Sequence, residues 1–137
     1  MELNRGLIKR RAAEIKKAVE ELKSITLAGK EEFLSSPTTI DASKYKLIVA
    51  IESALSICNH VAARLGKRIP ESYSDCFIIL GEAGIISEDL SRRLARMAKF
   101  RNMLVHIYWE IDDVEIFKII QKDLKDLEEF TGEVGRL

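Results

Sequence analysis

The stretch from Arg101 to Asp112, RNMLVHIYWEID, places an arginine, a histidine and a tyrosine at spacings that could do chemistry. Arginine binds phosphate through paired N–H donors, and an imidazole exchanges protons near neutral pH. Arg101 and His106 therefore suit transfer at a phosphodiester, with His106 as the base toward a ribose 2′-hydroxyl and Arg101 holding the phosphate. The same residue types also fit a structural role, as a salt-bridged arginine and a hydrogen-bonded histidine.

These residues belong to a predicted helix that follows Ser87, a suitable N-cap with acidic residues in the next turn. Apolar residues recur on this helix at three- and four-residue steps, and Arg101 occupies one position of the apolar seam. A guanidinium group is costly to bury unpaired, so this position must face a carboxylate, a water-filled cleft or a partner surface. Tyr108 is seven residues beyond Arg101 and is predicted on the same helix face.

Arg101 and His106 are five residues apart, which on an ideal helix separates them by about 140° around the axis. One straight helix therefore does not set them side by side. Either the long arginine wraps around the helix, the helix distorts near His106, or the groups meet across a two-fold contact between two copies of the chain. The third arrangement would form a cleft with two arginines and two histidines.

The segment that leads into the motif is basic: from Ser91 to Arg101, with Arg101 included, there are five basic residues and no acidic one. The whole chain has 22 basic and 22 acidic residues, so no overall charge attracts it to nucleic acid or membrane. Local contact with the RNA backbone is one interpretation of the basic residues, and an ordinary solvated face is the other. The residues concerned are Arg92, Arg96 and Lys99.

The elements that must position the motif are all predicted to be helices, because apolar residues recur at helical spacing and prolines are few. We expect one domain, residues 1–137, folded as an antiparallel four- to five-helix up-and-down bundle. The predicted helices span about 3–28, from an Asp41 N-cap to Gly66, about 73–80 after Ser72, from Ser87 through the motif, and from an Asp112 N-cap to about 131. A loop is expected around Ser35 to Pro37.

Other chemistry-bearing residues have simpler interpretations. Cys58 and Cys76 lie in apolar sequence without a CxxC pair or a signal-peptide pattern, and no apolar run approaches the roughly 20 residues of a membrane span. We therefore expect reduced core thiols, a cytoplasmic location and no membrane. We expect no cofactor and no metal, because His106 and Glu110 alone are not a site. His60 is predicted to be hydrogen-bonded, and Trp109 to pack or anchor an interface.

The pattern Arg101-Asn102-x3-His106-x-Tyr108 resembles the Arg-x4-His-x-Tyr motif of the HepT-like toxins, a branch of the HEPN ribonuclease superfamily. The runs YKLIVAIESALSICNH, IPESYSDCF and GIIS are similar to that family as well, so the resemblance covers nearly the whole chain. It implies a dimerising HEPN-like bundle with a metal-independent ribonuclease site in the cleft between protomers. Arg101 and His106 would be catalytic, and Asn102 would orient the site or the substrate.

The resemblance also implies a protein partner, a MntA-like minimal nucleotidyltransferase antitoxin that modifies Tyr108 with AMP. A bulky anionic group at the mouth of the cleft would repel RNA and block its entry. The alternative left open is a non-catalytic HEPN-like subunit that holds or regulates the nucleotidyltransferase. An arginine on the apolar seam favours the enzyme, since a purely structural subunit has no evident need for it.

Overall fold

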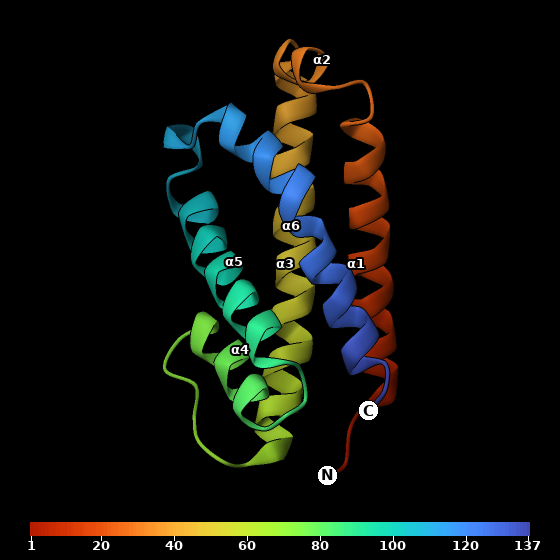
Figure 1. Ribbon diagram of the computed structural model, residues 1–137, viewed down its shortest axis with the longest axis vertical. Helices are drawn as coiled ribbons and strands as arrows, with labels where there is room; N and C mark the ends of the chain where they lie inside the picture. The colour runs from red at the N-terminus through yellow and green to blue at the C-terminus, as the bar shows by residue number, and fades with distance from the viewer.

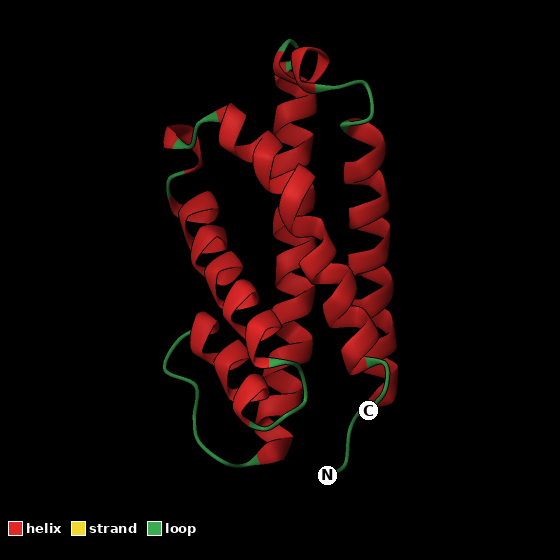
Figure 2. Ribbon diagram, viewed as in Figure 1, coloured by secondary structure: helices red, strands yellow, loops and turns green.

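The computed structural model describes residues 1–137 apart from the side chain of Tyr108. All regular secondary structure in the described chain is helical, which confirms the predicted all-α class (Figure 2). The elements in order are α1 Arg5–Ile25, α2 Lys30–Leu34, α3 Pro37–Leu65, α4 Tyr73–Glu82, α5 Glu88–His106, the 3-10 turn η1 Tyr108–Glu110, and α6 Asp113–Val134.

The four long helices, α1, α3, α5 and α6, form the bundle (Figure 1). α1 packs on α3 and α6, while α5 packs on α3, α6 and the short α4. Both chain termini lie at the α4 end of the bundle, and η1 lies at the opposite end. The core extends along the bundle, with Phe77 of α4 packed edge-on against Phe130 of α6 and Phe33 of α2 beside Phe117 of α6.

α3 is the central helix, as its apolar content predicts, and its buried residues run from Ile40 to Ala62. By length and composition alone it could cross a membrane, with a mean hydropathy of 1.3 in its most apolar window. In the folded chain 56% of that window is buried inside the protein. Packing against five neighbouring helices therefore accounts for the apolar composition of α3 without a bilayer.

α3 begins at Pro37, so the prediction of an Asp41 N-cap is wrong. The Ser36 hydroxyl accepts a hydrogen bond from the Thr39 N–H, and proline at the first helical position has the backbone angle a helix needs. Asp41 lies within the helix. The predicted end is confirmed, because Gly66 adopts the left-handed conformation (φ 63°) that terminates many helices.

α5 ends at His106, so the prediction that Tyr108 continues this helix is wrong. The Ile107 N–H still bonds to the Met103 carbonyl, but Ile107 leaves the helical conformation and η1 follows. The chain turns here because α6 begins at Asp113, where the Asp112 carboxylate caps the helix by accepting from the Val114 N–H. The inference that Arg101 and Tyr108 share one helix face therefore fails.

Arg93 of α5 ties that helix to α6 through an ion-pair network. Its guanidinium pairs with Asp126, which is buried, and with Glu129 at 3.1 Å. Its Nε also donates to Asp89 one turn earlier on α5. The hydrogen bonds to Glu129 and Asp126 raise the pKa of Arg93, with the Glu129 carboxylate as the largest cause.

We expect Arg93→Ala to lower the free energy of unfolding by about 3 kcal/mol, because it leaves the buried Asp126 carboxylate without its cation. Urea denaturation followed by circular dichroism measures the change. Arg92→Ala is the matched control, since the Arg92 side chain is exposed and its contact with Asp89 is long, 3.7 Å. Its effect should stay within about 0.5 kcal/mol, and equal losses in the two variants would contradict a structural role specific to Arg93.

Candidate active site

Arg101 lies on the buried side of α5, facing α3, and its side chain is only 14% exposed. Its Nε donates to Glu52 Oε1 at 2.7 Å, and its Nη2 donates to the same oxygen. The sequence predicted that this position must face a carboxylate, a cleft or a partner. Within the protomer the carboxylate is Glu52 of α3.

Two further groups hold the guanidinium in place. Its Nη1 donates to the Asn102 amide oxygen at 3.0 Å, and its central carbon lies 5.3 Å from the centroid of the Tyr73 ring at the start of α4. A cation over an aromatic face at this distance is attracted to the ring. Arg101 is therefore positioned by contacts from α3, α4 and its own helix.

This arrangement leaves part of the guanidinium able to bind an anion. A guanidinium has five N–H donors, and the contacts with Glu52 and Asn102 use three of them. The two remaining N–H bonds, one on each terminal nitrogen, are enough for a paired contact with phosphate oxygens. Because Glu52 and Asn102 hold the group before any ligand arrives, little side-chain entropy is lost on binding.

His106 is the last residue of α5, and its side chain is exposed. α5 is a regular helix from Arg101 to His106, so the two side chains keep their offset of about 140°. The helix is not distorted between them, but it ends at His106, and Ile107 leaves the helical conformation. Among the described residues none forms a hydrogen bond or ion pair with the His106 imidazole.

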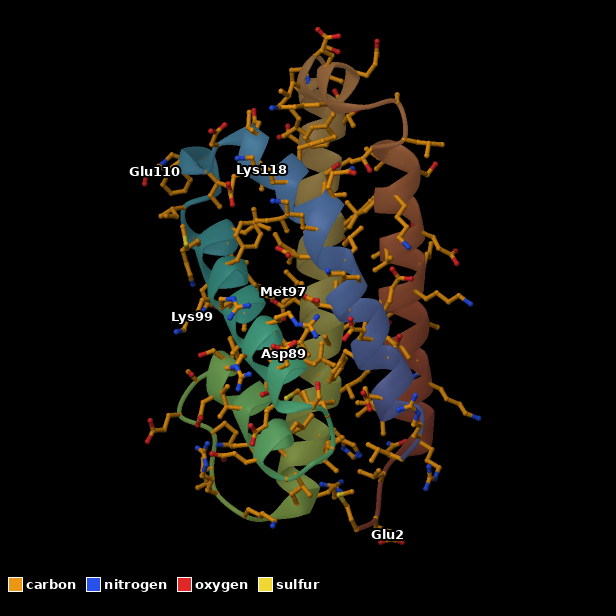
Figure 3. The ribbon with its side chains drawn as sticks, in the orientation of Figure 1. Glu2, Asp89, Met97, Lys99, Glu110 and Lys118 are labelled. Atoms are coloured by element: carbon orange, nitrogen blue, oxygen red, sulfur yellow. The ribbon has the colours of Figure 1, made fainter. Side chains whose placement is uncertain are left out.

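The basic residues before the motif share the outward side of α5 with His106. Residues at spacings of three and four positions form a stripe along this side of the helix. The stripe consists of Arg92, Arg96, Lys99, Met103 and His106. All five side chains are exposed, and Figure 3 shows Lys99 projecting away from the bundle. This side can meet a polyanion, and contact with the RNA backbone stays a prediction.

Two hollows flank α5. One, of about 400 Å³, lies beside Arg101 and is lined by Asn59, Pro70, Glu71, Ser72, Tyr73 and Asn102. The larger one, about 660 Å³, lies between α5 and α6 and includes neither Arg101 nor His106. The smaller hollow is therefore the one that adjoins the guanidinium, because Tyr73 and Asn102 both contact it.

Glu52 and Tyr73 are the site residues that sequence reasoning missed. Glu52 is the single acidic residue in the apolar run from Tyr45 to His60, which is a local signal for a special role. Tyr73 carries no comparable signal, because an aromatic residue at the start of a short helix is most simply assigned to packing. Its proximity to Arg101 depends on how α4 packs against α5.

The remaining candidates have structural roles in the protomer. The His60 Nε2 accepts from the Asn4 N–H at 2.9 Å, which confirms a hydrogen-bonded histidine, and burial followed by nearby Arg64 lowers its pKa. Cys58 and Cys76 are free and buried, as predicted, and burial raises the pKa of the Cys58 thiol. No group of three or more His, Cys, Asp or Glu residues in the described chain could hold a metal ion.

The residues after α5 complete the motif. Trp109 is 66% exposed, so it does not serve as a core residue of the protomer, and an interface role stays a prediction. The Tyr108 backbone begins η1, but the side chain on which the predicted modification falls lies outside the described residues.

Known proteins resemble this chain over nearly its whole length. The family described as "Ribonuclease HepT-like" matches residues 15–134. The mRNA nuclease HepT of Shewanella oneidensis is 28% identical over 124 residues, which are 90% of this chain and 92% of the relative. The tRNA nuclease HepT of Aphanizomenon flos-aquae is 26% identical over 114 residues, 83% of this chain and 78% of the relative.

The fold is also similar to a solved structure with a bound partner. The tri-AMPylated Shewanella oneidensis HEPN toxin, in complex with an MNT antitoxin, superimposes with a TM-score of 0.88 at 27% identity. The match covers 96% of this chain and 98% of the toxin chain.

Proposed function

Because this chain belongs to the family of HepT-like ribonucleases, we propose that it cleaves RNA with Arg101 and His106 at a site formed between two copies of the chain. The proposal rests on the position and hydrogen bonds of the Arg101 guanidinium. This group sits on an otherwise apolar seam, is oriented by Glu52 and Asn102, and keeps two N–H donors for a phosphate.

The proposed reaction is an attack by the ribose 2′-oxygen on the neighbouring phosphorus. The His106 imidazole takes the proton of the 2′-hydroxyl as the new P–O bond forms, and the bond from phosphorus to the 5′-oxygen breaks. The departing 5′-oxygen takes up a proton from water. Arg101 stabilises the charge that grows on the non-bridging oxygens, and Asn102 positions Arg101. The products are a 2′,3′-cyclic phosphate and a 5′-hydroxyl end.

Two copies of the chain are part of the proposal because the two side chains point in different directions within a protomer. Arg101 faces α3, whereas His106 lies on the exposed stripe of α5. Exposed apolar side chains surround the end of α5, namely Met103, Val105 and Trp109. Apolar residues grouped near polar ones are typical of a protein interface, and a two-fold contact there would bring His106 of one chain toward the site of the other.

The product ends give a direct test of this function. We expect the purified protein, confirmed by intact mass to carry no added group, to cleave single-stranded RNA in EDTA, because the proposed steps use the chain's side chains and water but no metal ion. The fragments should end in a 2′,3′-cyclic phosphate, identified by mass spectrometry. Fragments ending in a 3′-hydroxyl, or no fragments, would contradict the proposed chemistry and favour a non-catalytic subunit.

A protein partner is proposed from the solved relative. Because the Shewanella oneidensis HEPN toxin is tri-AMPylated in its complex with an MNT antitoxin, we propose that a MntA-like nucleotidyltransferase antitoxin neutralises this chain in the cytoplasm by adding AMP to Tyr108. Tyr108 follows His106 by two residues in the chain, so a polyanionic adduct on it would add negative charge to the motif and repel the RNA backbone.

Co-expression with such a nucleotidyltransferase should raise the intact mass in steps of one AMP and lower RNA cleavage. Tyr108→Phe should prevent both changes, since it removes only the hydroxyl that accepts AMP. Tyr45→Phe is the matched control, because Tyr45 is exposed on α3 and outside the motif. An unchanged mass in the parent, or the same increase in Tyr108→Phe, would reject the modification of Tyr108.

A further inference from the structure

The hollow beside Arg101 is assembled from four parts of the chain. Asn59 comes from α3, Pro70 to Ser72 from the segment before α4, Tyr73 from α4, and Asn102 from α5. Its volume, about 400 Å³, lies within the usual range for a small-ligand site. Tyr73 and Asn102 also contact the Arg101 guanidinium, so a ligand in this hollow would lie next to any phosphate that Arg101 holds.

The two asparagine amides at the hollow have their oxygens occupied. The Asn102 oxygen accepts from Arg101 at 3.0 Å, and the Asn59 oxygen accepts from the Cys76 thiol at 3.3 Å. In the described part of the chain neither amide nitrogen donates a hydrogen bond to a protein acceptor. Both asparagines line the hollow, so each has an N–H₂ group to offer to a ligand that supplies acceptor atoms.

The Tyr73 ring adds a surface for stacking. Tyr73 is 45% exposed although the Arg101 guanidinium lies over its ring. Flat aromatic bases stack on exposed tyrosine rings, and recognition of single-stranded RNA commonly combines such stacking with hydrogen bonds to the base edge.

The wall of the hollow is preformed. Arg68 donates two hydrogen bonds to Asp75, at 2.6 and 2.9 Å, and another to Glu82 at 3.0 Å. The Asp75 carboxylate also accepts from the Glu71 N–H at 2.9 Å. These contacts fasten the segment before α4 to the helix that follows, so a ligand meets an ordered wall.

We propose that this hollow binds one nucleobase of the RNA substrate, beside the phosphate that Arg101 holds, and that it selects the base. The inference rests on the proposed function. Two amide donors match a base edge with two neighbouring acceptors, such as N7 and O6 of guanine or N3 and O2 of cytosine. On the corresponding edges of adenine and uracil, an N–H donor lies between the two acceptors. The site therefore prefers guanine or cytosine.

The test measures binding without cleavage. His106→Ala serves as the parent, because His106 lies outside the hollow. Fluorescence anisotropy gives the dissociation constants of four labelled RNA hexamers that carry A, C, G or U at one central position in an oligouridine background. We expect a preference of about tenfold for G or C over A and U, the size of one good pair of base contacts.

Variants at the hollow separate base reading from stacking. Asn59→Ala and Asn59→Asp both remove the donor and should reduce the preference to within about twofold, and the aspartate retains the acceptor for Cys76. Tyr73→Ala should weaken all four hexamers about tenfold, whereas Tyr73→Phe should not. Tyr45→Ala is the control, because this exposed tyrosine lies fourteen residues before Asn59 on α3.

Equal affinities for the four hexamers in the His106→Ala parent, or a preference unchanged by both Asn59 variants, would overturn the base-selecting hollow. A preference that requires Asn59, found in a protein whose unaltered form cleaves no RNA, would support the hollow and reject the nuclease. RNA cleavage that requires Arg101 but shows no dependence on Asn59 or Tyr73 would support the nuclease and reject the base-selecting hollow.

Discussion

Arg101→Ala is expected to reduce the rate of RNA cleavage by about 10²- to 10³-fold, the usual cost of removing a preorganised group that stabilises transition-state charge. The rate is measured with labelled RNA at saturating protein, so that it reports the cleavage step and is not lowered by weaker RNA binding. Arg101→Lys should lose nearly as much, because an ammonium group cannot pair with Glu52 and Asn102 while offering two parallel donors to phosphate. Cleavage by Arg101→Ala at the rate of the unaltered protein would reject Arg101 as a catalytic residue.

Glu52→Gln distinguishes positioning from charge stabilisation. The amide retains an oxygen for Arg101 but weakens the ion pair, so the rate at saturation should fall by about tenfold, less than for Arg101→Ala. The affinity for RNA should not fall, since Glu52 makes no proposed contact with the substrate and a competing carboxylate has been removed. A loss confined to affinity would contradict the positioning role.

We expect the Arg101→Ala variant to remain folded. Glu52 is exposed, so Arg101→Ala leaves no buried unpaired charge and should change the free energy of unfolding by less than about 1 kcal/mol. Arg136→Ala is the matched arginine control, because Arg136 is exposed near the end of the chain and pairs only locally, with Glu133. Its cleavage rate should equal that of the unaltered protein.

The fold was predictable where local sequence determines it. Helical spacing of apolar residues identified the bundle, and Ser72, Ser87 and Asp112 cap the helices as predicted because capping depends on a few adjacent residues. The α3 start was mispredicted because Asp41 is as good a cap by type as Ser36. The deciding feature was Pro37, whose backbone angle favours a helix that begins there.

The site was predictable only in part. The seam position of Arg101 required a partner, but naming Glu52 requires knowledge of how α5 packs on α3, since the two residues are 49 positions apart in the chain. The end of α5 at His106 was missed because a histidine and an isoleucine are acceptable inside a helix. The turn there follows from the return of the chain into α6, which a helix-by-helix interpretation does not reveal.

Combining the two inactive variants Arg101→Ala and His106→Ala is expected to restore cleavage, because the proposed site takes its arginine from one chain and its histidine from the other. Each variant alone lacks one of these groups in both sites. In a mixed dimer one site carries both defects, while the other combines the intact Arg101 with the intact His106. Random pairing makes about half of the dimers mixed, so co-expression should recover about a quarter of the activity of the unaltered protein.

Differently tagged variants allow the mixed dimer to be purified through both tags, and its activity should then approach about half that of the unaltered dimer. The controls are each variant carrying both tags, purified in the same way, which should remain inactive. A mixed dimer as inactive as its parents would mean that Arg101 and His106 act within one chain. The arginine would then have to reach around α5 across an offset of about 140°, abandoning Glu52 on α3, so the Glu52→Gln variant would cleave faster than the unaltered protein.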